Sequence, residues 1–192
     1  MRRTWLLVAA AVVVVAAIVI AVVLVRNSKS ESTPSTTQWA GQVCTSLDKW
    51  RSSITSLASV SGATLDRDTL REKLTDAQVA TEQLITDLKN IGAPETTSGT
   101  KLKQQLEASG DQLDSSYENL KSGAQKALDA TSTVDFLRNL AALAPDFQKL
   151  LNEVSTTIET LQSSNVAGDS VDEVRQGFEN AESCKKLRSE QD

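Results

Sequence analysis

The sequence predicts an all-α protein with an N-terminal transmembrane helix, a flexible stalk, and an antiparallel bundle of four long helices plus a short C-terminal helix. Two observations predict this class. An unbroken apolar run of 21 residues extends from Trp5 to Val25, and beyond it apolar residues recur at intervals of three and four, the period of an amphipathic helix. No useful apolar–polar alternation competes as a strand signal. The predicted boundaries are residues 1–26 for the anchor, 27–37 for the stalk and 38–192 for the bundle.

The N-terminal segment is interpreted as a signal anchor. Crossing the hydrocarbon core of a bilayer takes about 20 apolar residues, and residues 5–25 meet that length without a polar side chain. The basic and indole side chains expected at the two membrane–water interfaces are Arg2, Arg3, Trp5 and Arg26. A cleavable signal peptide is the main alternative, although its apolar region is typically shorter, roughly 7–15 residues. The third interpretation is a buried helix of a soluble domain.

The direction of the span is predicted from the chain beyond it, because the basic residues on its two sides nearly balance. Without Arg2, Arg3 and Arg26, 17 of the 20 basic residues remain against 25 acidic ones. Two cysteines far apart in that part suit an oxidising compartment. We expect a single-pass cell-membrane protein with a cytoplasmic N-terminus and an extracytoplasmic C-terminal domain, or a secreted protein if the signal is cleaved.

The stalk, NSKSESTPSTT, is the next segment and holds one proline among polar residues. A segment of this composition buries too little apolar surface to fold, so it is predicted to be flexible. It serves either as a spacer through part of the envelope or as a tether of no special length.

The first two bundle helices follow from apolar spacing and end signals. A helix over residues 37–60 is predicted by the stripe Trp39, Val43, Leu47, Trp50, Ile54 and Leu57. Its two tryptophans are interpreted as core anchors, with ligand stacking as the alternative. The second helix begins at a cap formed by Asp66 or Asp68 and stops near Gly92 and Pro94. Its seam is Leu70, Leu74, Ala77, Thr81, Leu84, Leu88 and Ile91.

A third helix is predicted over residues 97–129, weakened in its middle by Ser109 and Gly110. Its inward residues are Leu102, Leu106, Leu113, Tyr117, Leu120, Ala124 and Leu128. A fourth begins at a capping box formed by Ser132 and Asp135. Its stripe is Phe136, Leu140, Leu143, Phe147, Leu150, Val154, Ile158 and Leu161.

Pro145 falls inside the fourth predicted helix. Because the stripe keeps its phase across this residue, we prefer one kinked helix to two separate helices. After the linker SSNVAG, Ser170 and Glu173 form a capping box for a short last helix. The residues of that helix expected to face inward are Val171, Val174, Phe178, Ala181 and Cys184.

The two cysteines lie near opposite ends of the bundle sequence. In an oxidising compartment Cys44 and Cys184 are expected to form an intramolecular disulfide, which contributes up to roughly 5 kcal/mol on the chain-entropy model. Catalytic thiol chemistry is disfavoured, since the chain has neither a Cys-x-x-Cys pair nor a histidine to activate a thiolate. A metal site formed by the two lone cysteines is even less favoured.

The composition also excludes several kinds of site. The absence of histidine removes Ser-His-Asp and Cys-His catalysis and histidine metal sites. The acidic balance disfavours nucleic acid, because phosphate neutralisation needs a basic face. Asp111, Asp114 and Glu118 share a helix face, as a solvated surface or a surface cation site. We expect no enzyme and assign no catalytic, cofactor-binding or metal-binding residue; a hydrolase that uses carboxylates alone is the least favoured class.

Three short patterns together resemble a known group of proteins. They are Trp39–Cys44–Trp50 on an early helix, IGAP after the second helix, and Phe178-x-x-Ala181-x-x-Cys184-x-x-Leu187 near the end. This combination resembles uncharacterised membrane-anchored or secreted helical-bundle proteins of high-GC Gram-positive bacteria, over roughly residues 38–188. The resemblance implies an envelope location and the disulfide, and it brings no activity with it.

These observations favour a non-catalytic, membrane-anchored extracytoplasmic bundle that acts through protein or cell-envelope contacts, with an exposed face of the third or fourth helix. Its expected partners are the lipid bilayer, through residues 5–25, and an envelope protein. The alternative is an extracytoplasmic small-ligand-binding accessory module. Because only Met1 to Thr4 precede the apolar run, we expect no cytoplasmic domain that could receive a signal directly.

Overall fold

The computed structural model describes residues 34–58 and 66–189; the predicted transmembrane helix and residues 27–33 of the predicted stalk lie outside them. No strand occurs in the described ranges. The elements are α2 (Thr36–Ala58), α3 (Arg67–Asn90), α4 (Gly99–Leu128), α5 (Thr133–Ala141), α6 (Ala144–Gln162), α7 (Ser164–Ala167), the 3-10 helix η1 (Gly168–Ser170), α8 (Val171–Asn180) and α9 (Glu182–Ser189). Among these helices, none has both the length and the apolar character needed to cross a membrane.

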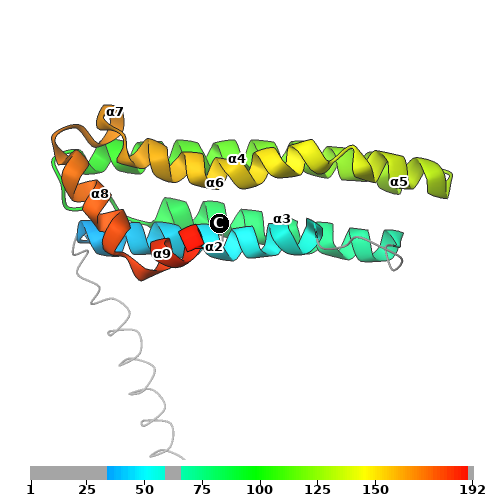
Figure 1. The fold of residues 1–192 in the computed structure, drawn as a ribbon, viewed down its shortest axis with the longest axis horizontal. Helices are drawn as coiled ribbons and strands as arrows, with labels where there is room; N and C mark the ends of the chain where they lie inside the picture. The colour runs from blue at the N-terminus through cyan, green and yellow to red at the C-terminus, as the bar shows by residue number, and fades with distance from the viewer. Residues whose placement is uncertain (1–33, 59–65, 190–192) are drawn as a thin grey trace, which may run out of the picture. The chain divides into compact units, whose positions relative to one another are not determined.

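The long helices form two layers, each of neighbouring antiparallel helices (Figure 1). α2 and α3 lie side by side in one layer, and α4 lies beside α5 and α6 in the other. After α6 the chain turns through α7 and η1, and α8 and α9 then pack against α2. The all-α prediction is therefore confirmed for the described residues. Thr36 and Thr37, assigned to the stalk from the sequence, are already part of α2.

The predicted seams form the core of the bundle. All seven seam residues predicted for the second helix are buried: Leu70, Leu74, Ala77, Thr81, Leu84, Leu88 and Ile91. Trp39 and Trp50 are 0% and 1% exposed, which confirms that they are core anchors. Trp39 also meets the ring of Phe178 edge to face, with the ring centroids 5.7 Å apart. Such a pair contributes roughly 0.5–1.5 kcal/mol beyond the apolar area that it buries.

The middle of α4 is packed more closely than its small residues suggest. Ser109 and Gly110 are both buried. A Cβ atom on Gly110 would lie 3.2 Å from Leu88 Cδ1, so the small residue lets α3 approach α4. Farther along α4 the seam shifts by one position, because Ala127 is buried whereas Leu128 is only partly buried.

Two predicted N-caps are confirmed. Asp66 Oδ1 accepts a hydrogen bond of 2.7 Å from the backbone N–H of Thr69 at the start of α3. Ser132 Oγ accepts one of 3.0 Å from the backbone N–H of Asp135 at the start of α5. Each bond satisfies one of the free donors in the first turn of a helix. Both helix starts are therefore fixed by local sequence.

The capping box predicted for the last helix is wrong. The Ser170 side chain makes no capping bond to α8; its Oγ lies 2.9 Å from Thr97 Oγ1 instead. Glu173 Oε1 accepts a 2.9 Å hydrogen bond from Thr36 Oγ1. Both residues therefore tie α8 to distant parts of the chain, because tertiary partners compete with the local bonds of a capping box. The predicted last helix is also divided at Ala181, whose backbone is extended.

The single kinked helix predicted around Pro145 is also wrong. α5 ends at Ala141 and α6 begins at Ala144, with Pro145 in its first turn. Proline has no N–H to donate to the carbonyl of Ala141, and its ring crowds that carbonyl. In the first turn of a new helix neither property is costly. The inward phase survives the interruption, since Phe136, Leu143 and Phe147 are all buried.

Candidate functional site

The predicted disulfide is present between α2 and α9. Cys44 and Cys184 are joined, with an S–S distance of 2.06 Å and Cα atoms 5.1 Å apart. Both residues are fully buried, and no free cysteine remains. The two sulfurs are therefore committed to a structural link, and the catalytic-thiol and thiol-metal alternatives do not apply to this oxidised chain.

Polar contacts reinforce the disulfide along the same interface. Ser183 Oγ donates to the Gly41 carbonyl at 2.8 Å, and Arg51 Nη1 donates to the Leu187 carbonyl at 3.1 Å. Lys186 Nζ lies 2.8 Å from Asp48 Oδ2, an ion pair between α9 and α2. We call α8, α9 and the disulfide that holds α9 to α2 the clasp.

The clasp depends on one close helix approach. A Cβ atom on Gly177 of α8 would lie 2.9 Å from the Thr36 carbonyl oxygen and 2.8 Å from its Cγ2. Only glycine allows α8 to approach the first turn of α2 this closely. By contrast, a Cβ atom on Gly41 would meet its nearest neighbours at 3.8 Å, an ordinary contact.

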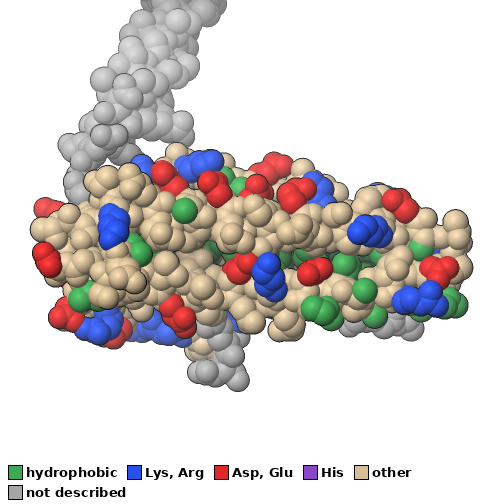
Figure 2. Space-filling model, turned by 90° about the horizontal axis from the view of Figure 1, so that it is seen from above, with side chains coloured by type: hydrophobic (Ala, Val, Ile, Leu, Met, Phe, Trp, Pro, Cys, Tyr) green, Lys and Arg blue, Asp and Glu red, His purple; other side chains and the backbone are tan. Residues whose placement is uncertain are grey.

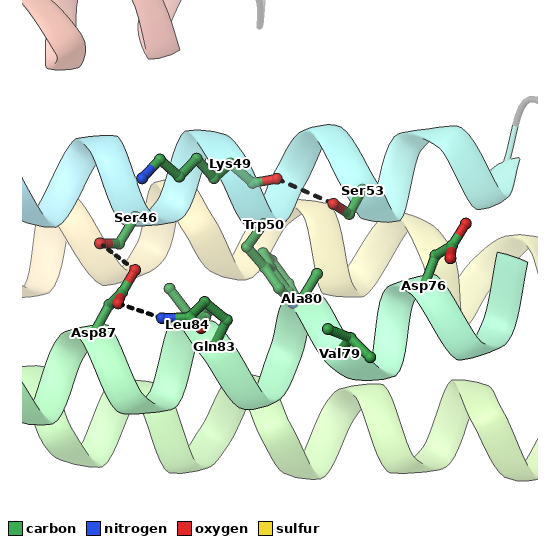
Figure 3. A pocket seen from close by; sticks show the side chains of 10 residues that line it. All are labelled: Ser46, Lys49, Trp50, Ser53, Asp76, Val79, Ala80, Gln83, Leu84 and Asp87. Carbon is green, nitrogen blue, oxygen red and sulfur yellow. Dashed lines mark hydrogen bonds between the residues drawn. The ribbon is translucent and has the colours of Figure 1, made fainter. Parts of the chain in front are cut away.

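A hollow of about 390 Å³ lies on the outer side of α2 and α3 (Figure 3). Its lining residues are Ser46, Lys49, Trp50, Ser53, Asp76, Val79, Ala80, Gln83, Leu84 and Asp87. At one end, Asp87 accepts hydrogen bonds from Ser46 Oγ at 3.4 Å and from Gln83 Nε2 at 2.7 Å. Val79 forms an exposed apolar wall. Periodicity pointed to the helices of this hollow, but it did not identify the hollow itself.

Three polar side chains inside the bundle are hydrogen-bonded within the fold: Trp50, Thr81 and Tyr117. Trp50 Nε1 donates to Thr81 Oγ1 at 2.9 Å, and Thr81 Oγ1 donates onward to the Ala77 carbonyl at 2.8 Å. The Tyr117 hydroxyl donates to the Leu74 carbonyl at 2.8 Å. Burial raises the pKa of Tyr117 to about 12, so this hydroxyl stays protonated at neutral pH.

The acidic residues predicted to share a face of the third helix lie on α4 and do not form a metal centre. Glu118 pairs with Lys121 at 3.0 Å, while Asp111 is exposed. Across residues 34–58 and 66–189, no group of three or more histidine, cysteine or carboxylate residues is arranged to hold a metal ion. Asp111 and Glu118 are exposed and Asp114 is partly buried, as a solvated helix face requires.

Two of the exposed large apolar side chains in the described chain lie on α5. Val134 and Leu137 are 66% and 51% exposed, and Ala141 and Ala144 continue the same spacing of three and four along the chain. We call these four residues the α5 face, although Ala144 is the first residue of α6. Figure 2 shows hydrophobic side chains gathered at the end of the bundle that α5 forms. Sequence reasoning named an exposed face of the third or fourth helix without identifying these residues.

The membrane-interface residues predicted from the sequence lie outside the described residues; they are Arg2, Arg3, Trp5 and Arg26. No protein-family model matches this chain, and no curated protein or solved structure is similar enough to match it. Inferences about its function therefore rest on the chain's own geometry, which offers a clasped end, a surface hollow and an exposed apolar helix face.

Proposed function

We propose that this protein is a non-catalytic, membrane-anchored helical bundle that acts outside the cytoplasm through protein contacts. The observation that carries this proposal is the α5 face, where two large apolar side chains remain exposed while Phe136, Leu143 and Phe147 of the inward stripe are buried. Neighbouring exposed apolar side chains that form a contiguous patch mark protein-contact sites. In this account the fourth predicted helix, observed as α5 and α6, supplies the contact surface.

Two further features support the location. The apolar run of residues 5–25 has the length of a membrane-spanning helix, with Arg2, Arg3, Trp5 and Arg26 proposed at its interfaces. The disulfide supports an oxidising compartment for the bundle. We also retain the proposed kinship with envelope proteins of high-GC Gram-positive bacteria, which rests on the Trp–Cys–Trp and C-terminal cysteine patterns.

Site-specific photocrosslinking in intact cells tests the contact function. A benzoylphenylalanine in place of Leu137 is expected to form a discrete crosslinked protein product in the envelope. The matched control carries the same group in place of Gln104, an exposed residue of α4. Equal product patterns at the two positions, or no product at Leu137, would contradict a contact role for the α5 face.

The membrane topology needs a separate readout. Thr156 is exposed on α6, and Thr156→Cys places an accessible thiol on the bundle without disturbing the buried disulfide. A membrane-impermeant maleimide is expected to label this variant in intact cells as fully as in lysed cells. Labelling that requires lysis would contradict an extracytoplasmic bundle.

The second candidate function is that of a small-ligand-binding accessory module, and the α2–α3 hollow favours it. The volume of about 390 Å³ lies within the range of ligand sites. Its apolar floor is flanked by Lys49, Asp76 and Asp87, groups able to orient a polar ligand. A thermal-shift screen of the full chain against amino acids, sugars and polyamines tests it. Stabilisation by one class that Val79→Arg abolishes would favour this candidate over the contact function.

A further inference from the structure

The α5 face is a second apolar stripe on the segment formed by α5 and the start of α6, which already has an inward stripe. Phe136, Leu143 and Phe147 are buried within the bundle. The α5 face uses different positions, of which Val134, Ala141 and Ala144 are all exposed. Among the described residues, α5 therefore has more apolar surface than its own bundle covers.

Four charged residues accompany this stripe, in the order acidic, basic, acidic, basic. They are Asp135, Arg138, Asp146 and Lys149. Asp135 and Arg138 form a 2.8 Å ion pair, with side chains that are 47% and 71% exposed. Asp146 and Lys149 are both exposed. The first two charges lie on α5 and the other two on α6, so the charges accompany the apolar stripe across the junction of the two helices.

The order of these charges is self-complementary in one orientation only. When a second copy of the segment runs antiparallel, the reversed order places Arg138 opposite Asp146 of the partner subunit and Asp135 opposite Lys149 of the partner subunit. Both pairings have the same register, centred on residue 142. In a parallel pair, each charge would lie opposite its own like charge, which is unfavourable.

We propose that a second copy of this chain occupies the α5 face, packed antiparallel about a two-fold axis beside Ala142. An isologous contact of this kind uses the same patch on both subunits. Val134 and Leu137 supply the apolar contact, and the small side chains of Ala141 and Ala144 allow close helix approach near the axis. This inference rests on the proposed contact function and names the partner of that same surface.

The contact is short, so its strength depends on tethering. The segment from Val134 to Lys149 is divided between α5 and α6 and would span about 24 Å at the helical rise. One face of that length is smaller than the roughly 800 Å² per partner of a stable interface. Anchoring both copies in one membrane raises their effective concentration. The pair therefore forms in the membrane and dissociates when the chains are dispersed.

Cysteine crosslinking of the full chain in its native membrane tests the pairing. Ala142→Cys places an exposed thiol beside the axis, and Ala108→Cys places one on the exposed side of α4. With a short bismaleimide, the Ala142→Cys protein is expected to form a covalent homodimer at least about tenfold more efficiently than the Ala108→Cys control, because only residues beside a two-fold axis meet their own copies. Equal yields at the two positions would overturn the proposal.

Charge reversal tests the orientation in the Ala142→Cys background. Arg138→Glu removes two symmetry-related ion pairs, and the homodimer yield is expected to fall roughly threefold. Adding Asp146→Arg is expected to restore it. The matched control is Arg175→Glu, which replaces an exposed i,i+3 ion pair on α8 by two like charges. It should leave the homodimer yield unchanged. Failure of the double variant to recover would overturn the antiparallel register.

The two proposals fail in distinguishable ways. If the thiol at residue 142 crosslinks to a different protein and never to its own copy, the second-copy inference is overturned and the contact function stands. If it crosslinks to no protein, and photocrosslinking at Leu137 also yields no product, both are overturned. A homodimer with the expected charge dependence supports both.

Discussion

The two ends of the bundle differ in how their apolar residues are covered. At the end where α2 begins, the clasp closes over α2, and Trp39 and Phe178 have no exposed surface. At the other end, Phe136 of α5 is buried while Val134 and Leu137 remain mostly exposed. Both ends follow the same helical period, so the difference lies in the tertiary partners that each end has.

The two ends also differ in how firmly their helices are held. Around the disulfide, backbone contacts, polar bonds and an aromatic pair all fix α8 and α9 to α2. Around α5, Arg67 donates to the Leu128 carbonyl at 2.6 Å and lies 5.0 Å from the Phe136 ring centroid, and Asn139 Nδ2 donates to the Lys126 carbonyl at 3.2 Å. We infer that the clasped end stabilises the fold, which leaves the α5 end available for contacts.

The largest expected effect is at the clasp. Replacing both cysteines, as Cys44→Ala with Cys184→Ala, should lower the free energy of unfolding by about 2–5 kcal/mol, because the disulfide closes a long loop. Urea unfolding of the full chain in detergent micelles, followed by circular dichroism, measures this change. A loss below about 1 kcal/mol would show that the disulfide is not a main stabilising element.

Next is the close approach of α8 to α2. Gly177→Ala inserts a methyl group against the Thr36 backbone, and such overpacking should cost about 1–3 kcal/mol. The matched control is Gly41→Ala, which meets only ordinary contacts and should be neutral or stabilising, by up to about 1 kcal/mol, through helix propensity. The same unfolding assay measures both variants. Equal effects would contradict the special role of Gly177.

A smaller effect is expected at the α5 end. Arg67→Gln removes the cation–π contact with Phe136 and the bond to the Leu128 carbonyl, and it should cost about 1–2 kcal/mol. Hydrogen exchange should speed up in α5 and remain unchanged in α8 and α9. Arg71→Gln, which breaks an exposed pair with Asp68, should change stability by less than about 0.5 kcal/mol. Faster exchange throughout the bundle would contradict the local role of Arg67.

The smallest effect concerns the N-cap of α3. Hydrogen bonds from Thr69 hold the pKa of the Asp66 carboxyl below its ordinary value of 3.8. The stabilising contribution of the carboxylate is therefore fully present above that ordinary value and is lost as pH falls through the lower, folded-state pKa. Asp66→Asn keeps a good cap without the charge, so its unfolding midpoint should fall less than that of the parent chain between pH 5 and pH 2. If the unfolding midpoints of the two proteins fell equally with pH, Asp66 would not be the charged cap of α3.

Sequence reasoning succeeded where a pattern has one structural solution. The seam from Leu70 to Ile91 fits one helix face, and Asp66 and Ser132 cap helices through bonds to residues three positions away. The disulfide followed because the chain has only two cysteines. The seam and the two caps depend only on residues close together in the sequence, and the disulfide had only one possible pairing.

It failed where the outcome depends on distant partners. Ser170 and Glu173 have the spacing of a capping box, but Thr97 and Thr36 bind their side chains instead. Val134 and Leu137 were missed for the same reason, because two apolar stripes share one segment and local spacing does not indicate which stripe the bundle covers. At Pro145 the seam kept its phase, and phase alone does not distinguish a kink from a break.

Hydrogen exchange of the full chain, compared between its native membrane and a monomeric detergent dispersion, tests the division between the two ends most directly. Residues 134–149 are expected to exchange more slowly in the membrane, where the α5 face is in contact, while α8 and α9 are expected to exchange equally in both conditions. Equal exchange at residues 134–149 in both conditions, or membrane protection confined to the clasp, would contradict this division.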